Sequence, residues 1–394
     1  MTAVFLTNYY NHHQKPLADA LYARLGDGYT FIETSRISEE RLRLGYGGDE
    51  QPSYVRQWYA SDTEKAACQE LVDTADVVIA GSAPLSLIQT RLRQGKLTFL
   101  YTERIYKSGV PLLKWPVHLL KALWRYVRYR KFYVLCASAY TPLDFLRLLA
   151  FIGKTYKWGY FPAVKRYENL EDVIEGKQPS TLLWTARFID LKHPEHAVEV
   201  ARRLKADGFN FTLRMIGNGA LEDEVRRLIE RETLTDCVEL LGSMTPEQVR
   251  EHMEKSEIFL FTSDRNEGWG AVLNESMNSA CAVVANSAIG SAPFLLEHGE
   301  NGYLYEDGNL DDLYAKVKRL LEYTEERKRL GTAAYHTMTE EWNAENAATR
   351  LLELSKQLLD GAHKPFPFAS GVCSKADILK DGWFTARRER NGNG

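Results

Sequence analysis

Short apolar runs that alternate with amphipathic segments are the feature that most restricts the fold of this chain. In the first half, Ala3–Leu6 reads as a strand and Leu17–Leu25 as a helix, and Asp76–Ala80 and Leu97–Tyr101 read as further strands. The second half repeats the alternation, with strands predicted at Thr181–Trp184, Thr212–Ile216, Val238–Leu241, Ile258–Phe261 and Ala282–Ala285, and helices at His196–Ala206, Ala220–Arg231, Pro246–Lys255, Val272–Ser279 and Ala344–Leu359. This alternation is typical of parallel, doubly wound sheets, so the sequence predicts an α/β fold.

The chain has 394 residues, too many for one ordinary core. A polar, acidic stretch at residues 165–180 separates the two series of strands and is predicted to be a linker; the alternative is a surface loop within one domain. We therefore expect an N-terminal domain at 1–164, the linker, a C-terminal domain at 181–360 and an extension at 361–394. The end of that extension, 387–394, has the composition of a disordered segment.

Composition excludes several classes of protein. The five cysteines are scattered, with no Cys-x-x-Cys pair, which argues against a disulfide framework and favours a reducing cytoplasm. No uncharged apolar stretch of about 18 residues is present, and the first residues lack the pattern of a signal peptide. There is no Asp-x-Asp and no His/Cys/acid group with ligand spacing, so neither a metal nor another cofactor is expected. We expect a cytoplasmic protein, with peripheral attachment to the inner face of the membrane as an alternative.

The segment Glu267–Glu275 (Glu-Gly-Trp-Gly-Ala-Val-Leu-Asn-Glu) is the strongest local sign of a ligand site. Its glycines let backbone N–H groups approach a ligand, and the predicted helix N-terminus that follows favours negative charge. The two glutamates cannot serve the same negatively charged group, but their carboxylates can accept hydrogen bonds from hydroxyl groups. The helical rise places the two glutamates on the order of 10 Å apart. That distance fits the two sugars on either side of a diphosphate. The alternative is that either glutamate only caps or decorates a helix.

This pattern resembles the signature of the retaining family 4 glycosyltransferases of bacterial surface-polysaccharide assembly. Their GT-B fold has two Rossmann-like domains that face each other across a cleft. The resemblance covers residues 180–360 and includes Arg187 at a strand end, Lys192 after it and the turn Gly217-Asn218-Gly219. That turn alone is weak, because it lacks the third glycine of a dinucleotide fingerprint.

The resemblance implies a role for each matching residue. Arg187 and Lys192 would hold the diphosphate, Glu267 the donor-sugar hydroxyls and Glu275 the ribose hydroxyls. Further donor contacts are implied for Gly217, Gly242, Met244, Gly268, Trp269 and Gly270. Cations aimed at a departing diphosphate stabilise the transition state more than the ground state. In this family the departing phosphate takes the acceptor's proton, so no protein nucleophile is assigned.

The loop after the first strand departs from the family pattern because Asn8–Pro16 contains no glycine. The loop still leaves the carboxyl end of a strand, where ligands bind in such sheets. His12 and His13 are therefore candidates for contact with the acceptor, against the alternative of a solvated loop. Glu103 and Arg104, which follow another strand, are weaker acceptor candidates.

The stretch from Arg104 to Leu143 holds eight basic residues and no acidic one. On a helical wheel of Lys114–Lys131, four basic residues gather on one side, namely Lys114, Lys121, Arg125 and Arg128. The other side carries Trp115, Leu119, Leu120, Leu123, Trp124 and Val127. A cationic face beside Trp and Leu is typical of a helix on an anionic membrane. The alternative is a helix packed by its Leu/Trp face. A nucleic-acid partner is not expected, because the net charge is -3 and no reader motif is recognisable.

The function that these observations favour is transfer of a hexose-type sugar from a nucleotide diphosphate to a glycan or polyprenol-linked acceptor, with anomeric retention. Two rivals stay open. A dinucleotide-dependent oxidoreductase would need Gly-x-Gly-x-x-Gly after the first strand, which is missing. A non-catalytic nucleotide- or glycan-binding protein would share the fold, since such folds serve many chemistries.

Overall fold

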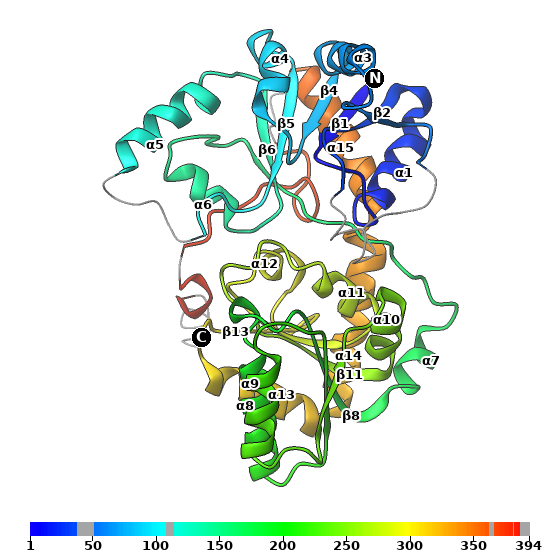
Figure 1. Cartoon of the computed structure of the whole chain (residues 1–394), viewed down its shortest axis with the longest axis vertical. Helices are drawn as coiled ribbons and strands as arrows, with labels where there is room; N and C mark the ends of the chain where they lie inside the picture. The colour runs from blue at the N-terminus through cyan, green and yellow to red at the C-terminus, as the bar shows by residue number, and fades with distance from the viewer. Residues whose placement is uncertain (38–50, 108–113, 362–365, 381, 387–394) are drawn as a thin grey trace. The chain divides into compact units, whose positions relative to one another are not determined.

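The computed structural model describes the chain apart from residues 38–50, 108–113, 362–365, 381 and 387–394. The chain divides into two compact units (Figure 1). Unit 1 comprises Met1–Ala163 and Trp342–Leu379, and unit 2 comprises Val164–Glu341 and Lys380–Gly394. Each unit contains one parallel sheet, which confirms the predicted α/β fold with two Rossmann-like domains.

Unit 1 is built on a seven-stranded parallel sheet of order β3-β2-β1-β4-β5-β6-β7. Its strands are β1 (Ala3–Thr7), β2 (Tyr29–Glu33), β3 (Val55–Gln57), β4 (Val77–Ala80), β5 (Leu97–Thr102), β6 (Phe132–Cys136) and β7 (Thr155–Lys157). Its α-helices are α1 (Lys15–Leu25), α3 (Asp62–Thr74), α4 (Gln89–Arg93), α5 (Trp115–Ala122), α6 (Thr141–Leu146) and α15 (Ala344–Leu359). The central strand β1 is buried throughout because neighbours cover both of its edges and helices cover its faces.

Unit 2 is built on a six-stranded parallel sheet of order β10-β9-β8-β11-β12-β13. Its strands are β8 (Gln178–Thr185), β9 (Thr212–Ile216), β10 (Val238–Gly242), β11 (Ser256–Phe261), β12 (Ala282–Asn286) and β13 (Tyr303–Tyr305). Counted from β8, the strand order is 3-2-1-4-5-6, that of a Rossmann sheet. The order reverses between β8 and β11.

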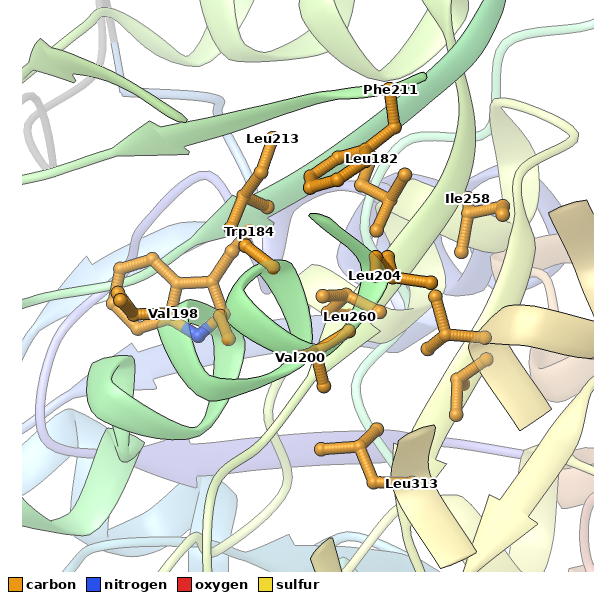
Figure 2. Packing of buried hydrophobic residues seen from close by; sticks show 14 of the residues in the cluster. Leu182, Trp184, Val198, Val200, Leu204, Phe211, Leu213, Ile258, Leu260 and Leu313 are labelled. Carbon is orange, nitrogen blue, oxygen red and sulfur yellow. The ribbon is translucent and has the colours of Figure 1, made fainter. Parts of the chain in front are cut away.

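The helices of unit 2 are α7 (Leu170–Glu175), α8 (Pro194–Ala206), α9 (Glu222–Arg231), α10 (Pro246–Lys255), α11 (Val272–Asn278), α12 (Ala292–Leu295), α13 (Leu310–Glu322) and α14 (Thr324–His336). One apolar cluster joins strands β8, β9 and β11 to helices α8 and α13 (Figure 2). Leu182 and Trp184 of β8 pack with Val198 of α8 and Leu313 of α13 in this cluster. The core therefore fixes β8, whose carboxyl end carries the candidate site.

The domain boundaries differ from those predicted. Residues 165–180, expected to be a linker, contain α7 and the start of β8 and belong to unit 2. Helix α15, expected in the C-terminal domain, belongs to unit 1, where Arg24 Nε of α1 donates to Thr349 Oγ1 at 3.0 Å. Apolar periodicity predicts that α15 is a helix but does not identify the sheet it covers.

The C-terminal extension also belongs largely to unit 1. Cys373 N donates to Lys157 O at 2.8 Å, and Lys157 N donates to Ser374 O at 2.8 Å. These bonds pair the extension with β7, the last strand of the sheet, and so cover an edge that would otherwise be exposed. The predicted disorder of 387–394 concerns residues outside those that the structure describes.

Among the described residues, no helix combines the length and the hydropathy that a bilayer crossing needs.

Candidate functional site

The carboxyl ends of β8 and β11 bring together two predicted segments that are far apart in the sequence. These strands are neighbours at the point where the strand order of unit 2 reverses, the usual place for a ligand in such sheets. Strand β8 leads into Arg187–Lys192, and β11 leads into the turn that carries Glu267–Gly270. Parallel pairing therefore places the predicted cations and the first glutamate at one edge.

Lys192 and Glu267 are in direct contact. The Lys192 ammonium donates to the Glu267 carboxylate, and each side chain is 14% exposed. The backbone of Lys192 is held as well, because Thr262 Oγ1 donates to Lys192 O at 2.7 Å and Trp184 Nε1 donates to Thr262 Oγ1 at 2.8 Å. Thr262 thus links the backbone of Lys192 to Trp184 of β8, and this fixes the point from which the lysine side chain extends.

Arg187 is exposed and forms no ion pair with the described residues. Beside it lies the turn after β9, where Phe188 N donates to Asn218 O at 2.8 Å. Gly217 has φ +134°, and a Cβ there would lie 1.9 Å from Ala186 O. Glycine is required at this position so that the β8 and β9 turns can approach each other. That approach leaves the Arg187 guanidinium at the edge, free to meet an anion.

Gly242 and Met244 lie at the neighbouring strand end. Gly217 N donates to Gly242 O at 2.8 Å, which joins the β9 and β10 turns. Gly242 has φ +72°, and no atom lies within 4 Å of the point that a Cβ would occupy there. Met244 is half-buried. The glycine is therefore needed for its backbone conformation, since the space around it is open.

Glu275 lies on α11 with a half-buried carboxyl group. Burial raises its pKa, and the charge of nearby Arg250 opposes part of that effect. None of the described residues donates a hydrogen bond to this carboxylate. A half-buried acceptor without a donor from the protein is suited to the hydroxyl groups of a ligand.

Trp269 and Gly268, both predicted to contact the donor, are buried. Trp269 is 1% exposed, and its Nε1 donates to Asn274 Oδ1 at 2.9 Å, so the indole lies in the core and holds the turn. Gly268 is buried with it. Gly270 has φ +81°, and a Cβ there would lie 2.4 Å from Phe261 Cζ, so this glycine lets the turn pack on β11.

A histidine cluster follows Lys192 directly and corrects the expectation that no His/acid group has ligand spacing. His193, Glu195 and His196 bring one ligand atom each within 4.8 Å of the others. His193 Nδ1 lies 2.7 Å from Glu195 Oε1, and this bond raises the pKa of His193. His193 has a left-handed backbone (φ +48°), and its ring stacks on His196. The cluster holds the turn that positions Lys192.

In unit 1, the acceptor candidates other than Arg104 lie close together. The rings of His12 and His13 are 3.9 Å apart, and the His13 ring stacks toward Tyr160 at 6.3 Å. Tyr160 OH donates to Glu103 Oε1 at 2.6 Å. Burial, and then His12, lower the pKa of His13 to about 4, so this imidazole is neutral near pH 7. Tyr160 was not predicted as a site residue; it follows β7 by three residues.

Arg104, also predicted to contact the acceptor, forms a buried ion pair with Asp144. Its side chain is 5% exposed and its Nη2 lies 3.2 Å from Oδ1 of Asp144, which is completely buried. Tyr106 N donates to the same carboxylate at 3.2 Å, and the guanidinium lies over the Tyr140 ring at 5.2 Å. Sequence spacing gave no sign of Asp144, forty residues away.

Known proteins resemble the chain in sequence and in fold. Residues 166–337 match the family model of glycosyl transferases group 1, and the match lies wholly within unit 2. HepE of Anabaena, whose crystal structure was determined in complex with UDP, superposes with a TM-score of 0.64 at 14% identity, covering 91% of this chain and 100% of that one. The chain has the GT-B fold. Sucrose-phosphate synthase of Thermosynechococcus elongatus shares it, with a TM-score of 0.61 at 15% identity over 92% of this chain and 100% of that one.

Among curated proteins, the amylovoran biosynthesis glycosyltransferase AmsK of Erwinia amylovora is 31% identical to this GT-B chain over 186 residues, 46% of each. An N-acetylgalactosaminyltransferase of Campylobacter jejuni, named for a diphospho-undecaprenol-linked acceptor, is 34% identical over 139 residues, 35% of this chain and 36% of that one. The chain thus matches less than half the length of these relatives.

Proposed function

We propose that this protein is a retaining glycosyltransferase that moves a hexose-type sugar from a nucleotide diphosphate to a glycan or polyprenol-linked acceptor in surface-polysaccharide biosynthesis. The observation that carries the proposal is the Lys192–Glu267 pair at the carboxyl ends of β8 and β11. A cation and a hydroxyl-binding carboxylate in contact suit a ligand in which a phosphate adjoins a sugar. The UDP complex of HepE and the names of the curated relatives support the same chemistry.

The proposed reaction needs charge stabilisation more than a nucleophile. The acceptor oxygen bonds to the anomeric carbon on the face from which the diphosphate departs, so the configuration is retained. The acceptor's proton passes to the departing phosphate oxygen. Negative charge grows on that diphosphate as its bond to the sugar breaks, and Arg187 and Lys192 offset the charge where it develops. Glu267 accepts from a sugar hydroxyl and shares Lys192 with the phosphate.

Glu275→Gln is expected to weaken nucleotide affinity about 10- to 100-fold, because hydrogen bonds to a charged acceptor contribute about 1.5–3 kcal/mol. Turnover at saturating donor should change much less, since ribose contacts are alike in the ground and transition states. Calorimetric titration with nucleoside diphosphates measures the first effect and steady-state kinetics the second. Glu251→Gln, an exposed glutamate on α10, is the matched control. Unchanged affinity in Glu275→Gln would contradict the assigned ribose contact.

We further propose that no metal ion is required, because Arg187 and Lys192 supply the positive charge. Activity is then expected to survive excess EDTA. The His193–Glu195–His196 cluster makes the test specific. If EDTA abolishes activity, magnesium, manganese or zinc restores it and Glu195→Gln prevents the rescue, the reaction uses a metal at that cluster and the proposal fails.

The function itself is tested by incubating the protein with a panel of nucleotide sugars and polyprenol-linked or free glycan acceptors. Proton NMR of the product reads the anomeric configuration. A retained linkage is expected, and an inverted one would exclude the proposed mechanism. Tight nucleotide binding without transfer to any acceptor would favour the non-catalytic alternative.

A further inference from the structure

Exposed apolar side chains are concentrated in one part of unit 1. Among the described residues, eleven large hydrophobic side chains are exposed, and eight of them fall between residues 115 and 152. We call these eight the apolar patch: Trp115, Val117, Leu120, Leu123, Trp124, Val127, Leu149 and Ile152. Leu120 is 67% exposed and Trp124 60%. Scattered exposed hydrophobic residues are ordinary, whereas a group of this kind marks an interaction surface.

Helix α5 and the π-helical turn Leu123–Val127 after it attach to unit 1 by a different side. Ala122 and Tyr129 are buried, and the Tyr126 ring packs against Phe145 and Phe151 at 5.6 and 5.3 Å. Ala122, Tyr126 and Tyr129 are three or four residues apart, so they lie on one side of the helix. The members of the apolar patch between residues 115 and 127 occupy other positions of the same helical segment. The sequence left open whether the Leu/Trp face packs on the domain, and these contacts show that most of it does not. Helix α5 lies at the margin of unit 1 (Figure 1).

The loop after α6 adds two members of the apolar patch. Trp115 Nε1 donates to Arg147 O at 2.9 Å, and Phe151 packs on Tyr126, so the loop adjoins α5 at one end and the π-helical turn at the other. Leu149 and Phe151 both have left-handed backbones with φ +53°. Bulky residues adopt this conformation at a cost, and here it turns Leu149 outward while Phe151 stays buried. Leu149 is thus exposed by a backbone conformation that is unfavourable for leucine.

Exposed cations alternate with the apolar patch along the sequence, and the one carboxylate between residues 104 and 152, that of Asp144, is buried against Arg104. Lys114, Lys121, Arg125, Arg128 and Arg130 are exposed, and no acidic residue occurs between Arg104 and Leu143. None of these five cations forms an ion pair with a described residue. The Arg128 guanidinium lies 4.0 Å from the centre of the Trp124 ring. The local charge is thus strongly positive in a chain whose net charge is -3.

We propose that the apolar patch and its cations form a docking surface for an anionic lipid bilayer. Tryptophan and leucine would enter the boundary between headgroups and acyl chains, while the lysines and arginines meet the lipid phosphates. A nucleic acid would use the cations but not the leucines, and a protein partner would not need so many cations without carboxylates around them. The surface does not depend on the donor chemistry proposed for unit 2.

The proposal is tested by co-sedimentation of the full chain with vesicles of phosphatidylglycerol mixed with phosphatidylcholine, and with vesicles of phosphatidylcholine alone. Binding to the anionic vesicles is expected, with little to the neutral ones. Rising salt should weaken it, because screening reaches about 8–10 Å at physiological ionic strength. Each cation lost should lower the partition coefficient about fivefold, the equivalent of about 1 kcal/mol. Arg125→Glu with Arg128→Glu should therefore lower it more than about 25-fold, two such factors multiplied.

Two further variants separate the sources of binding. Lys65→Glu with Arg93→Glu makes the same change of net charge at exposed residues of α3 and α4 and should bind as the wild type does. Leu120→Ser with Trp124→Ser should weaken binding at every salt concentration, because this variant removes apolar contacts, which salt does not screen. Circular dichroism and thermal melts check that each variant is folded.

Three results would overturn the proposal. The first is equal binding to both kinds of vesicle, or binding to neither. The second is an equal loss in the Lys65/Arg93 control, which would assign binding to net charge alone. The third is self-association of the wild type that Leu120→Ser with Trp124→Ser abolishes while vesicle binding is unchanged, which would make the patch a contact between copies of the chain.

Discussion

Replacing Lys192 by alanine is expected to lower turnover on the order of 100-fold, the loss typical of removing one group that stabilises developing charge. The lysine is held through its backbone by Thr262 and through its ammonium by Glu267, both of which follow β11, so the ammonium is oriented before the donor arrives. Because its interaction strengthens as the diphosphate leaves, kcat and kcat/KM should fall together. Initial rates with a verified donor measure both constants.

Lys205→Ala is the matched control for this prediction. Lys205 also pairs with a carboxylate, at 2.6 Å from Asp236, but on the exposed surface of unit 2. Its loss should leave turnover unchanged. Glu267→Gln tests the other member of the catalytic pair. This variant keeps the Lys192 ammonium and removes the negative charge of the Glu267 carboxylate, with which the ammonium pairs before the donor binds. A Lys192→Ala enzyme with wild-type kcat, or with only a raised KM, would contradict the assigned role.

The parts of the fold that follow from local pattern could be predicted from the sequence. Strands β9 and β12 and helix α10 lie within one residue of the predicted bounds, because a buried parallel strand is an apolar run and Thr245 forms a capping box at the start of α10. The meeting of Lys192 with Glu267 could be anticipated as well. Both follow strands of one parallel sheet, whose carboxyl ends share an edge.

The sequence could not predict which distant part of the chain a helix or a side chain packs against. Trp269 lies between two glycines of a ligand-like motif, yet its indole is in the core, because Asn274 offers it an acceptor there. Helix α15 has the same periodicity whichever sheet it covers. A helical wheel groups Leu120 with Trp124 but does not say which face meets the domain; that depends on Phe145 and Phe151, which come later in the chain.

Arg104 offers the sharpest test of such a choice, because its two assignments predict opposite outcomes. As a buried partner of Asp144, its replacement by alanine leaves a carboxylate without its counter-charge in a site that water does not reach. Breaking a buried pair in this way costs about 3–5 kcal/mol. Urea unfolding, followed by a probe in unit 1, should show that loss of stability in Arg104→Ala.

The double variant Arg104→Met with Asp144→Leu should recover part of this stability, since both charges are then absent and apolar side chains fill the space. Recovery should be incomplete, because Tyr106 N also loses its acceptor. Arg56→Ala is the control: Arg56 pairs with Glu64 at 2.6 Å but is partly exposed, and such pairs contribute about 0–1 kcal/mol. If Arg104→Ala instead kept its stability and lost transfer to the acceptor, the arginine would be an acceptor-binding residue, as its position after β5 first suggested.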